Sequence, residues 1–573
     1  MPGLVGFTLG SVPSERAQAV LESMRDAMHH QDTYSVDTPL CDAALCATRC
    51  HTATLQPEPQ PWVRDDISVW LDGEFYNRRE LDPQATADPQ LLLSLYQEDA
   101  ALKRLEEIDG LYTAVIYDAP AQQLHLVSDR CGLRPLYWTD HRGNLAWASE
   151  AKALLHLPAF EVRIDRRALD AFLNIGYLYD NLTWFEGMQR LPAACVLTWD
   201  LRTHSSTVRH YWSWEKIAPV TEPNEDDLAA ELGQRFTAAV RRRCRPTEEV
   251  GLVLSGGLDS RAILAALPDA PFSALTFGLA KSPDSRIASR VAHLKGMEHH
   301  CFDIDAGNWL APRLAGVWWT DGMLDILHMH SIEALERIKS LFAICLNGAG
   351  GDGLAGGGHL FAPDELVHHL EYRLGVAAHA GLLADLESYF ARLGSAHAFY
   401  VDHRMRCFSL YGLLMGTFHG LEYRLPFMDN DFQEMLYAAP DSLKRGNRLY
   451  RKMLLGTFPQ FYRSIPWQAT GVPIAWPTWA GRALRAARRI GRRSNPSFVD
   501  YYNWIRQEPA RSLIGEILHN PTALYPEYLP REEVRRAWEE HGEQGDRSAA
   551  LGRYLTFEVL LQQVFEGKWR PST

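Results

Sequence analysis

One short stretch, residues 250–260, constrains the fold of this chain more than any other. The apolar run Val-Gly-Leu-Val-Leu stops at Ser255 and gives way to Gly-Gly-Leu-Asp-Ser, after which helix-forming sequence resumes at Arg261. This pattern predicts a buried strand, a tight turn and the start of a helix. Glycines let the backbone approach a bound group closely, and the N–H groups and dipole of a helix N-terminus favour an anion. The stretch therefore predicts a phosphate-binding loop.

The acid inside this loop narrows the choice of ligand. A Walker loop needs a longer turn that ends in Gly-Lys-Ser/Thr, and no lysine follows the glycines here. Asp259 would repel bound phosphates unless it held a cation, and Mg²⁺ typically binds carboxylate and phosphate oxygens together. We therefore expect a nucleotide with Mg²⁺. The alternative is an ordinary glycine-containing turn between a strand and a helix.

Residues 255–260 resemble the pyrophosphate loop of ATP-pyrophosphatases that adenylate a carboxyl or carbonyl group, and the flanking sequence is similar to that of asparagine synthetases. The resemblance covers most of the chain. It implies ATP and Mg²⁺ as cofactors. With the loop itself, it indicates these nucleotide-contacting residues: Val253, Ser255, Gly256, Gly257, Leu258, Asp259, Ser260, Phe277 and Gly348.

Length and composition limit the remaining possibilities. A chain of 573 residues is too long for one hydrophobic core, so at least two domains are expected. The net charge of −13 argues against a nucleic-acid partner, and no apolar run is long enough to span a membrane. Nine scattered cysteines without a signal peptide predict reduced thiols and a cytoplasmic location. The one cluster matches none of the usual zinc spacings: Cys41, Cys46, Cys50 and His51.

Residues 1–212 resemble the glutamine-hydrolysing domain of the family, a layered αββα sandwich of the Ntn-hydrolase type. The matching segments are residues 68–77, 109–118, 128–137 and 148–154. In that family a cysteine thiolate next to the initiator Met attacks the amide of glutamine, whereas this chain has Pro2. An oxyanion-hole amide is replaced by Asp72, which would repel a developing oxyanion. We predict a degenerate amidotransferase domain that no longer hydrolyses glutamine.

Residues 213–573 are predicted to form a synthetase domain. A Pro-rich polar segment at 218–224 is the linker candidate, and Asn224 is the expected N-cap of the next helix. Strands that alternate with helices from there onward predict a doubly wound parallel sheet, and such sheets bind ligands at the carboxyl ends of their strands. The resemblance implies the ATP-pyrophosphatase fold (adenine nucleotide α-hydrolase-like) with a helical C-terminal part. The whole chain is thus predicted to belong to the α/β class.

Two later motifs complete the expected catalytic set. Residues 347–353, Asn-Gly-Ala-Gly-Gly-Asp-Gly, look like the family's second signature, which implies that Asp352 joins Asp259 as a Mg²⁺ ligand. Residues 422–429 are close to the family's Glu-x-Arg-x-Pro-Phe-x-Asp, and this similarity assigns a catalytic role to Glu422. On the helix that follows, Lys452 is predicted to neutralise phosphate charge. Alternatively, Lys452 is an ordinary solvent-exposed lysine of this helix.

Three departures from the asparagine synthetase pattern concern the substrate. Ala349 stands where those enzymes carry a glutamate, and their later active-site lysine would fall within residues 466–471, which contain none. No arginine lies between Arg313 and Arg337 to bind the α-carboxylate of free aspartate. That region instead holds Asp321, Asp325, His328 and His330. Such a pocket suits a substrate whose α-carboxyl is already part of a peptide bond.

Residues 467–473, Trp-Gln-Ala-Thr-Gly-Val-Pro, look cyclase-like, and residues 347–352 lack the tyrosine associated with the signature of β-lactam-forming synthetases. With these features the chain looks most like a lasso-peptide cyclase, a macrolactam synthetase that acts on a ribosomally made peptide. The resemblance implies that an Asp or Glu side chain of a leaderless precursor peptide is adenylated and then attacked by the peptide's own N-terminal amine. It also implies a leader peptidase partner. The alternatives are a β-lactam-type or other small-molecule amide synthetase, an ammonia-dependent asparagine synthetase, and a non-catalytic nucleotide-binding scaffold. The peptide, its ring size, the general base and the oligomeric state stay open.

A run of six arginines between residues 482 and 493 has two interpretations. It forms either a solvated helix face or a docking strip for an acidic partner.

Overall fold

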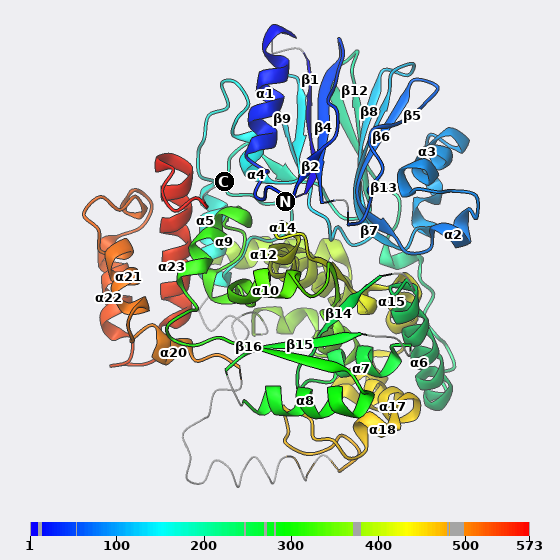
Figure 1. Cartoon of the computed structure of the whole chain (residues 1–573), viewed down its shortest axis with the longest axis vertical. Helices are drawn as coiled ribbons and strands as arrows, with labels where there is room; N and C mark the ends of the chain where they lie inside the picture. The colour runs from blue at the N-terminus through cyan, green and yellow to red at the C-terminus, as the bar shows by residue number, and fades with distance from the viewer. Residues whose placement is uncertain are drawn as a thin grey trace.

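The computed structural model describes residues 2–9, 14–52, 54–245, 248–268, 272–279, 282–368, 370, 380–477, 479, 481 and 498–571. Three β-sheets organise these residues. Two antiparallel sheets lie within residues 3–210, and a parallel sheet lies between residues 250 and 424. Figure 1 shows the two antiparallel sheets side by side at the top and the parallel sheet below them, with most helices around it.

The first antiparallel sheet contains the N-terminal strand. Its order is β11-β9-β10-β1-β4-β2, with β3 paired to β4. The bounds are β1 Gly3–Thr8, β2 Ser35–Val36, β3 Leu40–Cys41, β4 Leu45–His51, β9 Tyr137–Asp140, β10 Leu145–Ala148 and β11 Gln189–Arg190. Three helices accompany this sheet: α1 Ser14–Asp26, α4 Ala151–Leu154 and α5 Arg166–Ile175.

The second antiparallel sheet has the order β13-β12-β8-β7-β6-β5. Its bounds are β5 Trp62–Arg64, β6 Ile67–Phe75, β7 Gly110–Asp118, β8 Gln123–Ser128, β12 Cys195–Asp200 and β13 Ser205–His210. Helices α2 Arg78–Leu81 and α3 Asp88–Glu98 lie on its outer side (Figure 1). The two sheets bury Trp70, Trp147 and Trp199 between them. This layering of helix, sheet, sheet and helix agrees with the predicted αββα sandwich.

The parallel sheet has the order β16-β15-β14-β17-β18. Its bounds are β14 Val250–Val253, β15 Ser273–Gly278, β16 Glu298–Asp303, β17 Ile344–Leu346 and β18 Glu422–Arg424. From β14 the chain first builds outward through β15 and β16, and only then adds β17 on the other side. The strand order therefore reverses between β14 and β17, where the loops diverge and leave a crevice for a ligand.

Helices and π-helical segments fill the rest of the second half. The helices are α6 Glu225–Arg242, α7 Asp259–Ala266, α8 Pro283–Lys295, α9 Ala311–Trp319, α10 Leu335–Lys339, α12 Ala380–Leu393, α13 Ala396–Phe399, α14 Leu410–Phe418, α15 Asn430–Ala438, α16 Asp441–Lys444, α17 Arg448–Thr457, α18 Pro459–Tyr462, α20 Tyr501–Trp504, α21 Ala510–Leu518, α22 Arg531–Glu540 and α23 Ser548–Leu561. The π-helical segments near the parallel sheet are η5 Gly351–Ala355 and η7 Tyr400–Ser409. None of the helices in the described ranges is both long and apolar enough to cross a membrane.

One hydrophobic core joins the two halves of the chain. It contains Phe172 and Trp184 from the first half together with Phe557 and Leu560 from α23. The rings of Trp184 and Phe557 stack with their centroids 5.4 Å apart. Because α23 buries almost all of its residues, this last long helix fastens the C-terminal part to α5 of the first half and to α9.

The predicted cap of α6 is confirmed. The side chain of Asn224 accepts hydrogen bonds from the backbone N–H groups of Asp226 at 2.9 Å and Asp227 at 3.4 Å. Both residues, like Glu225, place an acid in the first turn, where the helix dipole favours negative charge.

Replacing Asn224 by alanine is expected to lower the free energy of unfolding by about 1 kcal/mol, because the first turn loses its side-chain acceptor. Equilibrium denaturation measures this loss. Asn224→Ser is the matched control and should retain most of the stability, since a serine hydroxyl also caps. An alanine variant as stable as the parent chain would contradict the capping role.

The prediction that all cysteines are reduced is wrong at one pair. Cys41 and Cys46 form a disulfide with their Cα atoms 4.2 Å apart. The cause is the pairing of β3 with β4, which places these two residues directly opposite each other. Cys50 stays a free, buried thiol.

Candidate functional site

The predicted phosphate loop connects the end of β14 to the start of α7 and is held by its own polar groups. The backbone N–H of Ser255 donates to Ser260 Oγ at 2.9 Å, and that of Gly257 donates to Ser255 Oγ at 3.1 Å. The backbone N–H of Gly256 donates to a carboxylate oxygen of Asp284 at 2.9 Å. An anionic oxygen thus already lies against a glycine N–H of this loop, as expected of an anion-binding turn.

Asp259 and Asp352 lie next to each other, as the sequence predicted. The carboxylate of Asp259 accepts a hydrogen bond from the backbone N–H of Asp352 at 3.0 Å and another from the hydroxyl of Tyr450 at 2.8 Å. A Cβ atom on Gly351 would fall 2.3 Å from Asp259 Cγ, so only glycine permits this approach. The two loops therefore depend on glycine to bring their acids together.

The electrostatics of this pair fit a divalent cation. Desolvation by crowding protein atoms, together with the negative charge of Asp352, raises the pKa of Asp259 to about 8. Within the described residues, no Lys or Arg forms an ion pair with either carboxylate, and no cluster of three or more His, Cys, Asp or Glu offers a metal site. Two carboxylates beside a phosphate loop match the way Mg²⁺ is held by one or two acids plus phosphate oxygens. When bound, Mg²⁺ would neutralise charge on the phosphates.

The residues predicted to contact the adenosine surround the same crevice. Val253 ends β14, and Phe277 lies near the end of β15, where both side chains are half-buried. A Cβ atom on Gly348 would lie 3.0 Å from the backbone nitrogen of Ser260, so the third residue is close to the loop. A cavity of about 450 Å³ adjoins Phe277 at the ends of β15 and β16.

Phe498 covers this end of the sheet, although no motif assigned it to the nucleotide site. Its ring meets that of Phe277 edge-on with centroids 5.6 Å apart. Its backbone oxygen accepts a hydrogen bond from Leu279 at 2.9 Å. A Cβ atom on Gly278 would fall 2.7 Å from the Phe498 ring. The C-terminal segment thus closes over strand β15, more than 200 residues earlier in the chain.

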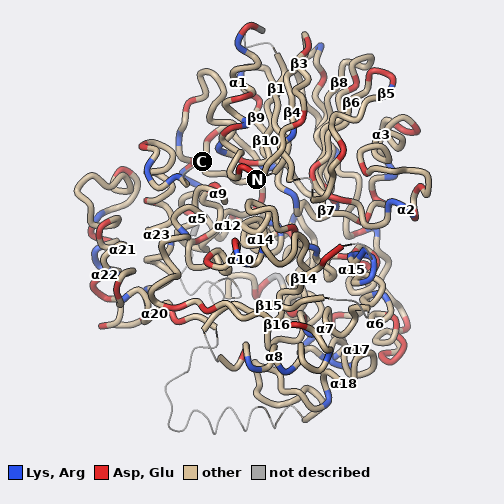
Figure 2. The backbone as a smooth tube through the Cα atoms, viewed as in Figure 1, with Lys and Arg blue, Asp and Glu red and all other residues tan. Residues whose placement is uncertain are grey.

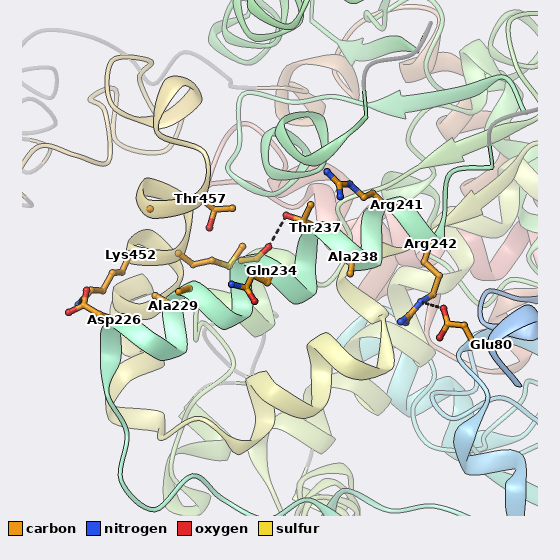
Figure 3. Close-up of a pocket in the computed structure, with 14 residues that line it drawn as sticks. Glu80, Asp226, Ala229, Gln234, Thr237, Ala238, Arg241, Arg242, Lys452 and Thr457 are labelled. Carbon is orange, nitrogen blue, oxygen red and sulfur yellow. Dashed lines mark hydrogen bonds and ion pairs between the residues drawn. The ribbon is translucent and has the colours of Figure 1, made fainter.

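The assignment of Lys452 to the phosphates is contradicted. Its ammonium group lies 2.8 Å from a carboxylate oxygen of Asp226. Figure 3 shows the two side chains together at a groove of about 850 Å³ that α6 and α17 line. Side chains two positions apart on a helix point to nearly opposite faces. Because Tyr450 contacts Asp259, the side chain of Lys452 points away from Asp259. Tyr450 is the residue of α17 that reaches the loop, and no sequence pattern pointed to it.

The catalytic role predicted for Glu422 is contradicted as well. Glu422 begins β18 opposite Ile344, at the amino edge of the sheet, whereas the phosphate loop lies at the carboxyl edge. Its buried carboxylate accepts a hydrogen bond from a guanidinium N–H of Arg134 at 2.7 Å. Glu422 and Arg424 share one face of this strand, and both contact the first half of the chain.

In the first half, buried charged side chains beside the N-terminal strand pair with one another. Arg49 is buried and donates to Asp37 at 2.7 Å and to the backbone oxygen of Glu58 at 2.9 Å. Asp72 is also buried and lies 3.8 Å from Arg134, and desolvation raises the pKa of its carboxyl group. No motif had pointed to Arg49 or Asp37. The guanidinium of Arg49 is therefore already paired within the protein.

Replacing Pro2 by cysteine is expected not to create glutaminase activity. The substitution supplies a thiol, but Arg49 stays engaged by Asp37, and Asp72 stays an acid at the predicted oxyanion position. Glutamate release from glutamine measures the outcome. The comparison is the triple variant Pro2→Cys, Asp37→Ala, Asp72→Asn, which removes both obstacles. Glutamate formed by the single variant above the parent's background would contradict this prediction.

Buried ion pairs connect the degenerate domain to the parallel-sheet half. Arg424 donates to both carboxylate oxygens of Glu74, at 2.6 and 2.9 Å, and Arg243 bonds Asp109 at 3.1 Å. Arg243 also bonds Asp429 at 2.6 Å. Figure 2 shows acidic and basic residues together at α6 and α15, close to β7. The acids of the first half are therefore partners for arginines of the second.

The four side chains predicted to line a substrate pocket divide into two buried acids and two more accessible histidines. Asp321 bonds the ammonium group of Lys152 at 3.0 Å, and Asp325 caps a short helical turn, so both acids are buried and serve the fold. His328 is exposed, and His330 is half-buried beside Phe498. The arginine run at 482–493 lies outside the described residues.

Comparisons with known proteins agree with this two-part organisation. A glutamine amidotransferase domain model matches residues 1–212, and an asparagine synthase model matches residues 231–410. Asparagine synthetase [glutamine-hydrolyzing] 2 of Bacillus subtilis is 25% identical over 78% of this chain and 68% of its own length. Asparagine synthetase of Rattus norvegicus is 26% identical over 67% of each chain. Asparagine synthetase 3 of B. subtilis is 29% identical over 37% of this chain and 35% of its own length.

Among solved structures, a glutamine phosphoribosylpyrophosphate amidotransferase from B. subtilis matches 52% of this chain and 65% of its own. The identity is 12% and the TM-score 0.27, which is too low to define a shared fold.

Proposed function

We propose that this chain is an asparagine synthetase-like, ATP-dependent ligase that releases AMP and pyrophosphate, and that within this group it is a macrolactam synthetase of the lasso-peptide cyclase type. In this proposal ATP adenylates the side-chain carboxyl of an Asp or Glu in a leaderless precursor peptide. The N-terminal amine of the same peptide then closes the ring.

The observation that carries the proposal is the contrast between the two centres. The phosphate loop keeps both acids adjacent, with a cavity beside Phe277. The amidase centre has Pro2 in place of a nucleophile, and Asp37 neutralises Arg49. A ligase that activates a carboxyl group but cannot draw ammonia from glutamine needs another amine, and the substrate itself can bring one.

The chemistry balances without further reagents. A carboxylate oxygen attacks the α-phosphorus of ATP and pyrophosphate leaves, which gives the acyl-adenylate. The amine nitrogen then attacks the acyl carbon, AMP leaves with the electron pair of the broken C–O bond, and the amine loses a proton. If the peptide is held with both groups in contact, positioning contributes about 7–11 kcal/mol to catalysis. Asp259 and Asp352 would hold Mg²⁺ for the first step.

The test compares amine sources in one assay. The purified protein receives ATP and Mg²⁺ with either aspartate plus ammonium or a leaderless peptide that begins with Gly and carries an internal Asp or Glu. Pyrophosphate, AMP and product mass are read together. The proposal expects turnover only with peptide and a product lighter by one water. Turnover with aspartate would replace it by an ammonia-dependent asparagine synthetase, and ATP binding without any release would indicate a scaffold.

A further inference from the structure

A continuous wall of side chains leads away from the nucleotide crevice. It starts at Phe498, whose ring lies 5.1 Å from that of His330. The rings of His330 and His328 are 6.2 Å apart, and that of His328 lies 4.9 Å from Phe408. The guanidinium of Arg404 stacks over Phe408, 3.8 Å from the ring centre. We call these five residues the rim.

The rim returns to the metal-binding acids through η7. Arg404 and Phe408 lie on this π-helical segment, which packs against η5, the segment that carries Asp352. A Cβ atom on Gly353 would fall on the Tyr400 hydroxyl, and one on Gly350 would lie 3.7 Å from Met405 Cε. The rim therefore runs from the adenosine end of the sheet to the side of Asp352, and π-helical segments of this kind are frequent at functional sites.

Among the described residues, no carboxylate forms an ion pair with the guanidinium of Arg404. The electrostatics of Tyr177 place its hydroxyl beside this guanidinium, and that hydroxyl also shares a hydrogen bond with His403 at 2.7 Å. Neighbouring arginines are used differently: Arg406 bonds Asp402 at 2.8 Å, and Arg313 bonds Glu333 at 2.7 Å. Arg404 is half-buried, so its guanidinium is both accessible and partly desolvated, which favours binding of an anion.

The histidines of the rim add no competing charge at neutral pH. His328 is solvent-accessible although protein atoms crowd it, as on a concave surface, and this crowding together with the charge of Arg404 lowers its pKa. Burial lowers the pKa of His330 well below its ordinary value of 6.5. The groups facing Arg404 are thus a tyrosine hydroxyl, an aromatic ring and a neutral imidazole.

We propose that Arg404 binds the substrate carboxylate that the ATP site activates, with the rim as the wall of that substrate site. A guanidinium can hold a carboxylate through two parallel N–H bonds, and η7 approaches the nucleotide crevice from the side of Asp352. The side chains nearest to Gly256 of the phosphate loop are those of Asp284 and Gln468, and Arg404 is not among them. This inference rests on the proposed adenylating function.

The test separates carboxylate binding from turnover. The probe is N-acetyl-aspartate α-methylamide, together with its glutamate counterpart, because the side-chain carboxylate is then the only charge. Binding is measured by titration calorimetry with Mg²⁺ and a non-hydrolysable α,β-methylene ATP. Arg404→Gln is expected to lose at least about tenfold in probe affinity while its nucleotide affinity stays unchanged. Arg404→Lys should lie between, and Arg392→Gln, which changes an exposed side chain of α12, should match the parent.

Three results would overturn the inference: probe binding by Arg404→Gln equal to that of the parent, no probe binding by the parent, or an equal loss of nucleotide affinity, which would assign Arg404 to phosphate. Thermal unfolding without ligands checks that the variants fold. If Arg404→Gln does not fold, the probe affinity of Arg404→Lys serves as the test instead. A parent chain that does not bind Mg²⁺ and the ATP analogue would refute the proposed function instead. Turnover of free aspartate would refute the cyclase while leaving the role of Arg404 standing.

Discussion

Asp259→Asn is expected to abolish nearly all pyrophosphate release without weakening the fold. The substitution removes a carboxylate that we propose binds Mg²⁺ next to the predicted phosphate loop, and losses of this kind are about 10²–10³-fold in rate, or about 3–4 kcal/mol. It also removes a crowded carboxylate whose pKa the charge of Asp352 raises, so the metal-free protein should be at least as stable as the parent. Pyrophosphate release and equilibrium denaturation measure the two effects.

Lys452→Gln is the matched control for this experiment. The lysine lies on the same helix as Tyr450 but bonds Asp226, so its removal should leave pyrophosphate release within about twofold of the parent. If Lys452→Gln were as inactive as Asp259→Asn, the orientation of α17 described above would be wrong and the phosphate role of the lysine would be restored.

Glu74→Gln is expected to destabilise the protein by about 3 kcal/mol. The substitution leaves the buried guanidinium of Arg424 without its bidentate partner, and a buried charge that loses its partner typically costs about 3–5 kcal/mol. Arg424 keeps Glu248 at its outer side, which places the expected value at the lower end. Denaturant titration measures the loss.

Two controls bracket this value. Arg535→Gln breaks an exposed ion pair with Glu532 and should cost less than about 1 kcal/mol. The double variant Glu74→Gln, Arg424→Met should recover part of the stability, because it removes the uncompensated charge along with its partner. If Glu74→Gln lowered the free energy of unfolding no more than Arg535→Gln does, the contact between Glu74 and Arg424 would not hold the two halves together.

The pairing of Glu74 with Arg424 also predicts how the stability contributed by Glu74 changes with pH. Burial by itself would raise the pKa of Glu74, but Arg424 and Arg245 override it and hold the pKa below its ordinary value of 4.5. A carboxyl group with a lowered folded-state pKa stabilises the protein above its unfolded-state pKa and loses that contribution as the pH falls through the folded-state value. The difference in stability between the parent and Glu74→Gln should therefore shrink on acidification below about pH 4.5.

Several features were determined by the sequence alone because their cause is local. The run at 250–260 contains its own strand, turn and helix start, so the loop formed as predicted. Asn224 caps α6 through groups two and three residues away. The absence of a nucleophile at Pro2 is a fact of chemistry that no packing can reverse.

Only the tertiary structure decided which distant side chains meet. Lys452 and Tyr450 sit two positions apart, and the packing of α17 on α6 selects the tyrosine to face Asp259. Glu422 contacts Arg134 because β18 places its amino end toward the first half of the chain. The pairing of Cys41 with Cys46 follows from a strand register that spacing does not reveal.

The rim shows the same limit most clearly. Phe498, His330 and Arg404 come from segments that are far apart in the sequence, and none carries a motif that names its neighbours. A local sequence pattern predicts backbone conformation and shows whether a reactive group is present. The orientation of a helix, the register of a strand and the pairing of buried charges depend on the free energy of packing the whole chain, and these set which groups share a site.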